Sequence, residues 1–349
     1  MDARRSMVRA VDPVLSSRRR RDSLRSIVSP DDHTPERTML EQINLDRSIP
    51  KDEYKSRRDA LELRLGELQR EAQDLGVPLM VVFQGWGAAG KGTQINQLIL
   101  PLDPRGFTVH TTKDPTEDEA MRPFLWRFWR VVPARGRMTV LDRSWYSRVL
   151  VDRFTGELSD REAERAFGDI RSFERQLTDD GMVIVKFFLH ISRKEQKRRQ
   201  KKLMENEATS WRVSDYDREQ NRRYDDYVNL ADRAIAETDT DHAPWTVVEA
   251  TDRRFAALKI GRTVIAALER GLARARAQRD EPLPIRAAIQ LPPELSTTML
   301  DRVDLDQSLD WEEYHDELDA LQDRIHELGH RIYRHRLPVV IVYQGWDAA

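Results

Sequence analysis

The chain has 349 residues, of which 39% are hydrophobic and 34% charged, and its formal net charge is −2. This length suits one large domain or two ordinary ones, and the near-neutral balance argues against general binding of nucleic acid. The absence of cysteine excludes disulfides, zinc–thiolate sites and thiol catalysis, and is compatible with the cytoplasm, where we expect the protein. No apolar run approaches the roughly 18–20 residues of a membrane span. No signal-peptide core follows the N-terminal arginines, so we expect neither secretion nor a membrane partner.

The first part of the chain contains two segments of different character. Residues 1–36 contain SSRRRRDSLRS and little apolar periodicity, which is typical of a disordered basic tail; a targeting or anion-binding arm is the alternative. Residues 51–75 repeat leucine at near-helical spacing, at Leu61, Leu65 and Leu68, and therefore predict a long amphipathic helix.

The stretch after this helix, VVFQGWGAAGKGT, is typical of a P-loop. A short apolar strand is followed by Gly85, Gly90 and Gly92 and then by a helical pattern, so that loop amides and a helix N-terminus would bind phosphate oxygens. Lys91 should reach the transferable phosphate. A P-loop usually has Ser or Thr directly after the lysine to hold Mg²⁺, but here Gly92 has that position and Thr93 follows it. The alternative is a fortuitous glycine-rich turn.

The rest of the first 277 residues alternates short apolar strands with helices. After the P-loop strand, we expect strands at 106–111, 138–141, 182–189 and 245–249. We expect helices at 117–129, 158–177, 192–204, 215–237 and 253–277. This alternation predicts a doubly wound α/β fold with a parallel sheet, in which ligands bind at the carboxyl ends of the strands. The 182–189 run is the most apolar, as a central parallel strand should be.

Charged residues at a predicted strand end are candidates for phosphoryl transfer, which needs a positioned donor, cations on its oxygens and Mg²⁺. Asp142, in LDRSWY after the 138–141 strand, is placed as a carboxylate that binds Mg²⁺. Arg143 beside it could hold phosphate oxygens through two hydrogen bonds. The alternative is a helix-capping aspartate followed by a surface arginine.

The predicted 192–204 helix is strongly basic, with seven basic residues among the ten from Arg193 to Lys202. It suits a mobile lid that closes over phosphates, with Arg198 and Arg199 as the best candidates; an ordinary solvated helix face is the alternative. Lys113 is a further candidate contact for phosphate or acceptor. For the following tryptophans we expect packing rather than base stacking: Trp126, Trp129, Trp145, Trp211 and Trp245.

The segment that starts near Thr298 repeats the segment that starts near Thr38. Three matched pairs, Tyr54 and Tyr314, Pro78 and Pro338, and Gly85 and Gly345, are each 260 positions apart, so no gap is needed. Such an ungapped register indicates a duplication. We therefore expect residues 278–297 to be a proline-rich linker and 298–349 the truncated start of a second copy. By domain-size reasoning the complete protein would have roughly 500–550 residues.

Several of these segments resemble the polyphosphate kinase type-2 family. GWGAAGKGT, DPTEDE, FLWRFWRVVPARGRMTVLDRSWYSR, HISRKEQKRRQKK with SWRVSDYD, and DHAPWTVVEATDRRFA occur in family order over residues 38–275. With the repeat, the chain resembles the fused two-domain class, the polyphosphate:AMP phosphotransferases. The resemblance implies transfer of the terminal phosphoryl group of inorganic polyphosphate to AMP, which gives ADP. The family loop is of the Gly-Lys-Gly type, which accounts for Gly92.

The resemblance also implies the architecture and the site. It implies a thymidylate-kinase-like P-loop domain over 37–277, with a parallel sheet, flanking helices, a helical lid and Mg²⁺ as cofactor. Lys91, Asp142, Arg143 and Arg199 match the family pattern. Polyphosphate and AMP or ADP are the implied partners, and we expect a homo-oligomer.

One position departs from the family loop, G-x-D-x-x-G-K-G. The aspartate is replaced by Gly87 here, whereas Asp347 stands at the matching position of the second copy. A positioned acid–base group is worth roughly 10²–10⁴ in rate, so the hypothesis is that the first copy is catalytically weak and Asp347 belongs to the active one. Two other functions stay open: an ATP-dependent nucleotide kinase, and a non-catalytic domain for polyphosphate binding or assembly.

Overall fold

The structure, a computed structural model, describes residues 38–280 and 300–345. The basic tail expected at 1–36, most of the linker expected at 278–297, and Asp347 lie outside the described residues. The first three residues of that expected linker belong instead to a helix, α11, which continues to Asp280.

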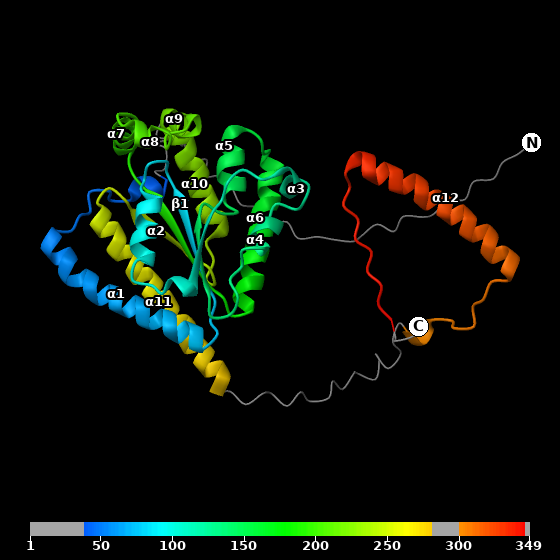
Figure 1. Cartoon of the computed structure of the whole chain (residues 1–349). Coiled ribbons are helices and arrows are strands. Elements are labelled where there is room, and N and C mark those ends of the chain that lie inside the picture. The colour runs from blue at the N-terminus through cyan, green and yellow to red at the C-terminus, as the bar shows by residue number, and fades with distance from the viewer. Residues whose placement is uncertain (1–37, 281–299, 346–349) are drawn as a thin grey trace, which may run out of the picture. The chain divides into compact units, whose positions relative to one another are not determined.

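One five-stranded parallel sheet forms the centre of residues 38–280 (Figure 1). Its order is β2-β3-β1-β4-β5, and all neighbouring strands pair in parallel. The strands are β1 (Leu79–Gly85), β2 (Phe107–Thr111), β3 (Met138–Asp142), β4 (Val183–His190) and β5 (Trp245–Glu249). The predicted α/β class and all five strands are therefore confirmed.

Strand β1 is in the middle of the sheet and β4 lies next to it, so the 182–189 run is an interior parallel strand, as its apolar content indicated. Every residue of both strands is buried, because each lies inside the sheet and is covered on both faces. Apolar content distinguishes such interior strands from the edge strands β2 and β5, whose residues are partly exposed, but it cannot order two interior strands between themselves.

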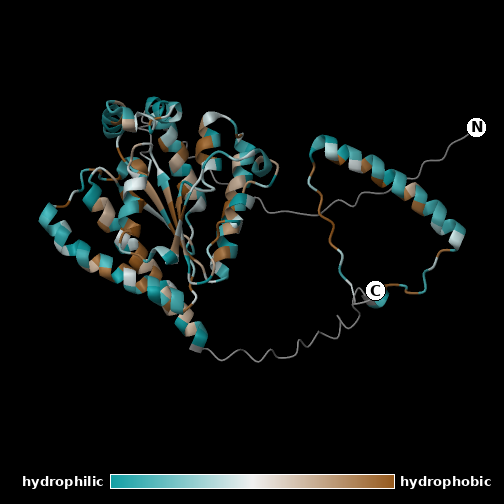
Figure 2. Ribbon diagram, viewed as in Figure 1, coloured by the Kyte–Doolittle hydropathy of each residue, from teal (hydrophilic) through white to brown (hydrophobic). Residues whose placement is uncertain are grey.

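Helices cover both faces of the sheet (Figure 1). On one face, α11 packs along α1 and against β4, and α2 lies beside it. On the other face, α6 and α10 pack against each other. The bounds of these helices are α1 (Lys51–Asp74), α2 (Lys91–Ile99), α6 (Asp160–Asp179), α10 (Tyr224–Thr238) and α11 (Arg253–Asp280). Figure 2 shows the apolar residues concentrated in the strands and on the inner sides of these helices.

The single helix expected at 117–129 is wrong. The structure has two short helices there, α3 (Glu117–Ala120) and α4 (Trp126–Trp129). Pro123 lies between them, and proline cannot continue a helix because its nitrogen has no hydrogen to donate and its ring clashes with the preceding turn.

The helix expected at 215–237 is also divided, into α9 (Asp215–Arg222) and α10. Arg223 separates them with φ −100° and ψ 45°, and no Gly or Pro marks this break in the sequence. The basic helix is confirmed as α7 (Arg193–Met204). Five short helical segments in residues 38–280 were not predicted: η1 (Leu40–Gln42), η2 (Pro104–Gly106), η3 (Arg148–Asp152, a π-helix), α5 (Arg153–Thr155) and α8 (Glu207–Ser210).

Residues 300–345 contain η5 (Leu300–Arg302) and α12 (Trp311–His335), and α12 begins 260 residues after the start of α1, at the offset of the sequence repeat. The strand expected after Pro338 is absent: residues 338–345 have no regular structure and their large apolar side chains are exposed. No strand in the described part of the chain pairs with them. None of the helices in 38–280 and 300–345 is both long and apolar enough to cross a membrane.

Candidate functional site

The P-loop forms between β1 and α2, where two glycines are required. Gly90 ends the loop with φ 98°, a left-handed conformation that other residues rarely adopt, and caps α2. Gly85 has φ 125°, and a Cβ there would lie 2.3 Å from the Leu189 carbonyl oxygen of β4. The loop therefore closes tightly against β4 and directs the N-terminus of α2 into the space above the strands.

A cleft of about 1400 Å³ opens at this loop. Eight of the predicted site residues line it: Gly90, Lys91, Gly92, Thr93, Asp142, Arg143, Arg198 and Arg199. Two other predicted residues, Gly85 and Lys113, do not line the cleft. Lys113 follows β2, and its carbonyl oxygen accepts a hydrogen bond from Arg127. The carboxyl ends of β1 and β3 and the basic helix α7 thus meet at one place, as a doubly wound sheet predicts.

The Lys91 side chain folds back over the loop. Its Nζ donates to the carbonyl oxygens of Gly85 (3.2 Å) and Trp86 (2.9 Å). Burial lowers the pKa of this ammonium to about 8; Asp142 opposes the shift and Arg143 adds to it. A phosphate oxygen in the cleft would offer the ammonium a charged partner in place of two carbonyl groups, and such charge-assisted bonds are about twice as strong.

Asp142 and Arg143 occupy the end of β3. The Arg143 backbone has φ 63°, which is uncommon outside glycine and is found where surrounding structure fixes it. Here its N–H donates to the Phe83 carbonyl oxygen (3.0 Å) and its own carbonyl oxygen accepts from the Thr112 hydroxyl (2.9 Å). The strand end is therefore held on both sides, and both side chains line the cleft.

Arg198 and Arg199 are neighbours in α7 with different roles in the structure. Arg199 is only 8% exposed, and its guanidinium donates to backbone carbonyl oxygens on two loops. Those acceptors are Ala88 and Ala89 of the P-loop and Ala250 and Thr251 after β5. Arg198 is exposed, and among the residues that the structure describes its side chain bonds only to Glu195. Arg199 thus ties α7 to two loops, whereas Arg198 keeps donors that a phosphate can use.

A network of buried amides joins α7 and α9 to Gly87. The Gly87 N–H donates to Gln220 Oε1 (2.9 Å), and Gln196 Nε2 donates to that same oxygen (2.9 Å) and to the Gly87 carbonyl oxygen (3.3 Å). Gln196 and Gln220 are 0% and 1% exposed and come from α7 and α9. Both backbone polar groups of Gly87 are therefore bonded to glutamines of α7 and α9.

Asp217 is one of the cleft residues that the sequence did not reveal. It lines the cleft from α9 and is 6% exposed. A Cβ on Gly87 would lie 2.1 Å from its Oδ1, while its Oδ2 accepts from the Ser214 N–H (2.9 Å) and hydroxyl (2.8 Å). The only sequence signal was the Ser-x-x-Asp motif at Ser214–Asp217, which is typical of the start of a helix. That motif does not indicate that the Asp217 Oδ1 faces Gly87.

The cleft has a donor set that fits Mg²⁺. This ion is bound by one or two carboxylates together with phosphate oxygens and water. Asp142 and Asp217 both line the cleft and both raise the pKa of Lys91, so the two carboxylates lie near one ammonium. Within 38–280 and 300–345, no group of three or more His, Asp or Glu could hold a metal by itself. The residues therefore fit an ion that is completed by substrate phosphates.

Trp211 is 75% exposed and lines the cleft, so the packing expected for it is wrong. Its Nε1 donates to the Ala208 carbonyl oxygen (2.9 Å) in α8, which fixes the ring outside the core. Trp145, by contrast, is fully buried as expected.

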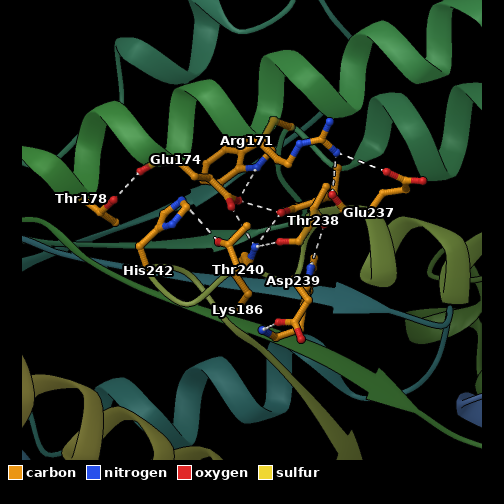
Figure 3. A network of polar contacts seen from close by, with 12 residues as sticks. Arg171, Glu174, Thr178, Lys186, Glu237, Thr238, Asp239, Thr240 and His242 are labelled. Carbon is orange, nitrogen blue, oxygen red and sulfur yellow. Dashed lines mark hydrogen bonds and ion pairs between the residues drawn. The ribbon is translucent and has the colours of Figure 1, made fainter.

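A buried charged network supports the segment that follows Arg143 (Figure 3). Lys186 of β4 and Glu174 of α6 are both 0% exposed, and Lys186 Nζ lies 2.8 Å from Glu174 Oε2. Glu174 Oε1 accepts from Trp145 Nε1 (3.1 Å) and from the Tyr146 hydroxyl (2.7 Å). Burial lowers the pKa of Lys186 and raises that of Glu174, and their mutual attraction opposes both shifts. Trp145 and Tyr146, which follow Asp142–Arg143 closely in the chain, are thus held in place by Glu174 of α6.

Comparison with known proteins agrees with this geometry. The family described as Polyphosphate kinase 2 (PPK2) matches residues 48–276. A polyphosphate:AMP phosphotransferase from Pseudomonas syringae pv. tomato is 38% identical over 69% of this chain and 49% of its own length. One from Pseudomonas aeruginosa is 39% identical over 67% of this chain and 47% of its own length. The chain therefore spans about half the length of the curated relatives it matches.

A solved structure supports the fold as well as the sequence relation. The polyphosphate kinase 2 of Arthrobacter aurescens TC1 is 32% identical, with a TM-score of 0.63, over 66% of this chain and 84% of that one. Its similarity fits the P-loop kinase-like sheet described above. The chain belongs to the polyphosphate kinase 2 family.

Proposed function

We propose that this domain transfers the terminal phosphoryl group of inorganic polyphosphate to AMP and forms ADP. The observation that carries the proposal is the single cleft in which P-loop, strand-end and lid residues meet. The names of the two relatives from Pseudomonas support AMP as the acceptor. Phosphoryl transfer depends chiefly on positioning and charge, and this cleft offers both.

In this proposal an AMP phosphate oxygen attacks the terminal phosphorus of the polymer. A new P–O bond forms, the bond to the next phosphate breaks, and the chain leaves one phosphate shorter. Lys91 and the loop amides hold the transferring phosphoryl group, Arg143 and Arg198 bind its oxygens, and Arg199 positions the loop from behind. Gly90, Gly92 and Thr93 complete the phosphate cradle. Bound Mg²⁺, held by Asp142 and Asp217, would neutralise phosphate charge.

A second candidate is a domain that binds polyphosphate without efficient turnover. It is supported by Gly87, which has no acid and whose backbone groups both bond to lid glutamines. The further expectations from the sequence stay proposals: a second domain copy led by Asp347, a homo-oligomer, and the cytoplasm. The duplication is supported by the constant 260-residue offset and by relatives about twice as long as the matched region.

The test measures ADP formation by the 349-residue chain from AMP and Mg²⁺, with polyphosphate or ATP as donor. We expect ADP only with polyphosphate, and a loss of turnover with Lys91→Ala. ADP formed equally well from ATP would replace the proposal by a nucleotide kinase. Polyphosphate binding without any ADP, abolished by Lys91→Ala, would replace it by the binding domain.

A further inference from the structure

The lid has a second groove on the side that does not line the cleft. This groove, of about 660 Å³, runs between α7 and α9. Its lining consists of five cationic side chains and one amide: Arg193, Lys194, Lys197, Arg218, Asn221 and Arg222. No carboxylate and no aromatic ring belongs to this lining.

The charge in the groove is poorly balanced. Lys194 and Lys197 have no hydrogen bond or ion pair among the described residues, and both are exposed. Arg193 donates only to a backbone carbonyl, that of Arg222 (2.8 Å). Like charges three and four positions apart on a helix repel each other, so an anion in the groove would relieve this repulsion.

The two remaining cations are paired only at the surface. Arg218 bonds to Asp215 and Arg222 to Glu219, each within one turn of α9. Asp215 has a side chain that is 96% exposed, and such exposed pairs contribute little free energy. These arginines can therefore exchange a carboxylate for a phosphate at small cost.

The groove and the cleft are two sides of the same pair of helices. Arg198 and Lys202 of α7 line the cleft, whereas Lys194 and Lys197 line the groove. Lys201 is exposed and, at 3.6 residues per turn, lies on the groove side of α7 between Lys194 and Lys197, and Lys194 is only about 40° around the helix from Arg198. A belt of cations thus continues around α7 from one site to the other, and Figure 2 shows α7 and α9 as largely hydrophilic.

We propose that this groove binds the part of a polyphosphate chain that extends beyond the cleft. This inference rests on the proposed function for the identity of the ligand. A polyphosphate carries a negative charge on every unit, so a continuous cationic track suits it. A single-stranded nucleic acid would also need flat rings on which its bases could stack, and the groove has none.

The hydrogen bonds between α7 and α9 show which residues of the groove can be changed without separating the two helices. Asn221 donates to the Arg193 carbonyl oxygen (3.0 Å) and to Gln196 Oε1 (2.9 Å), so Asn221 and Arg193 hold α7 to α9. Lys194 and Lys197 make no such bond. The variant Lys194→Gln/Lys197→Gln therefore removes two charges without loosening the lid.

The experiment measures direct binding of two ligands by the 349-residue chain without AMP, at several salt concentrations. The matched control is Lys51→Gln/Lys55→Gln, which removes from α1 two exposed charges that have no ion pair within residues 38–280 and 300–345. For chains of about 100 phosphates we expect Lys194→Gln/Lys197→Gln to raise the Kd about fivefold and to lower the salt slope by about one to two. Binding of tripolyphosphate should not change, and the control should bind both ligands as the parent does.

Three results would overturn the proposal. The first is unchanged binding of the long chain by Lys194→Gln/Lys197→Gln. The second is an equal loss for tripolyphosphate, which would show damage in the cleft. The third is tighter binding of a single-stranded RNA of equal charge, which would displace the long polyphosphate chain from the protein. The readout needs no turnover, so the groove is supported if the length-selective loss occurs even where the parent forms no ADP.

Discussion

At position 87 the room that a side chain would need is occupied by a carboxylate from another element. Asp217 Oδ1 faces the glycine, and its other oxygen is held by Ser214. Moving Asp217 away would break the capping bonds at the start of α9. The loss of the loop acid and the position of Asp217 are therefore coupled, and restoring the acid alone does not restore the family geometry.

We expect Gly87→Asp to destabilise the domain rather than to activate it. Gly87→Ala already overfills the site and should lower the free energy of unfolding by about 1–3 kcal/mol. The aspartate adds a like charge beside Asp217 and should cost more. Urea unfolding and ADP formation are the measurements.

The matched variant is Gly87→Asp/Asp217→Ala, which clears the space and moves the carboxylate from the lid to the loop. It should recover part of the stability lost in Gly87→Asp. A Gly87→Asp protein as stable as the parent and faster in turnover would contradict the coupling.

Phosphate binding should depend on pH through Lys91, whose pKa is about 8. Below that pH the ammonium carries its charge; above it the free protein loses the proton that phosphate binding requires. Affinity for tripolyphosphate should therefore fall by up to about tenfold per pH unit above pH 8. Lys91→Arg keeps its charge at all these pH values, so its profile should lack this inflection. Parallel profiles for the two proteins would show that another group titrates.

At the scale of elements, the buried Lys186–Glu174 pair joins β4 to α6. Lys186→Met should lower the free energy of unfolding by about 3–5 kcal/mol, because it leaves a buried carboxylate without its cation. Adding Glu174→Gln removes that charge and keeps an acceptor for Trp145 and Tyr146. The double variant should be more stable than Lys186→Met alone in urea unfolding. A double variant less stable than Lys186→Met would show that the charge is compensated elsewhere.

The strands were predictable to within two residues because buried parallel strands are short apolar runs between turns. The helix bounds were less predictable than the strand bounds, since no Gly or Pro in the sequence marks the break at Arg223. The P-loop could be found because its glycines and lysine follow one another at a fixed spacing. Asp142 could be found because it directly follows a predicted strand. Asp217 and the backbone contacts of Arg199 could not, because their partners are distant in sequence and only the fold brings them together.

At the scale of the whole chain, one pattern is found in two environments. LMVVFQG at 79–85 is the fully buried strand β1, while VVIVYQG at 339–345 includes five consecutive apolar residues with exposures from 58% to 89%. In residues 38–280, strands on both sides pair with β1 and helices on both faces of the sheet cover its side chains. The second occurrence has no strand partner in the described residues. Exposed β-branched runs of low charge are templates for intermolecular pairing.

We therefore expect the 349-residue chain to self-associate through residues 339–343, with association that grows with protein concentration. Val340→Lys/Val342→Lys places two charges on one side of the extended segment and should reduce the associated fraction severalfold in sedimentation velocity. The control Val303→Lys/Leu305→Lys adds the same charges at exposed apolar residues outside this run and should associate as the parent does. An oligomer built on residues 38–280 would persist in both variants. Equal association of the parent and Val340→Lys/Val342→Lys would therefore assign the contact to that domain rather than to the exposed run.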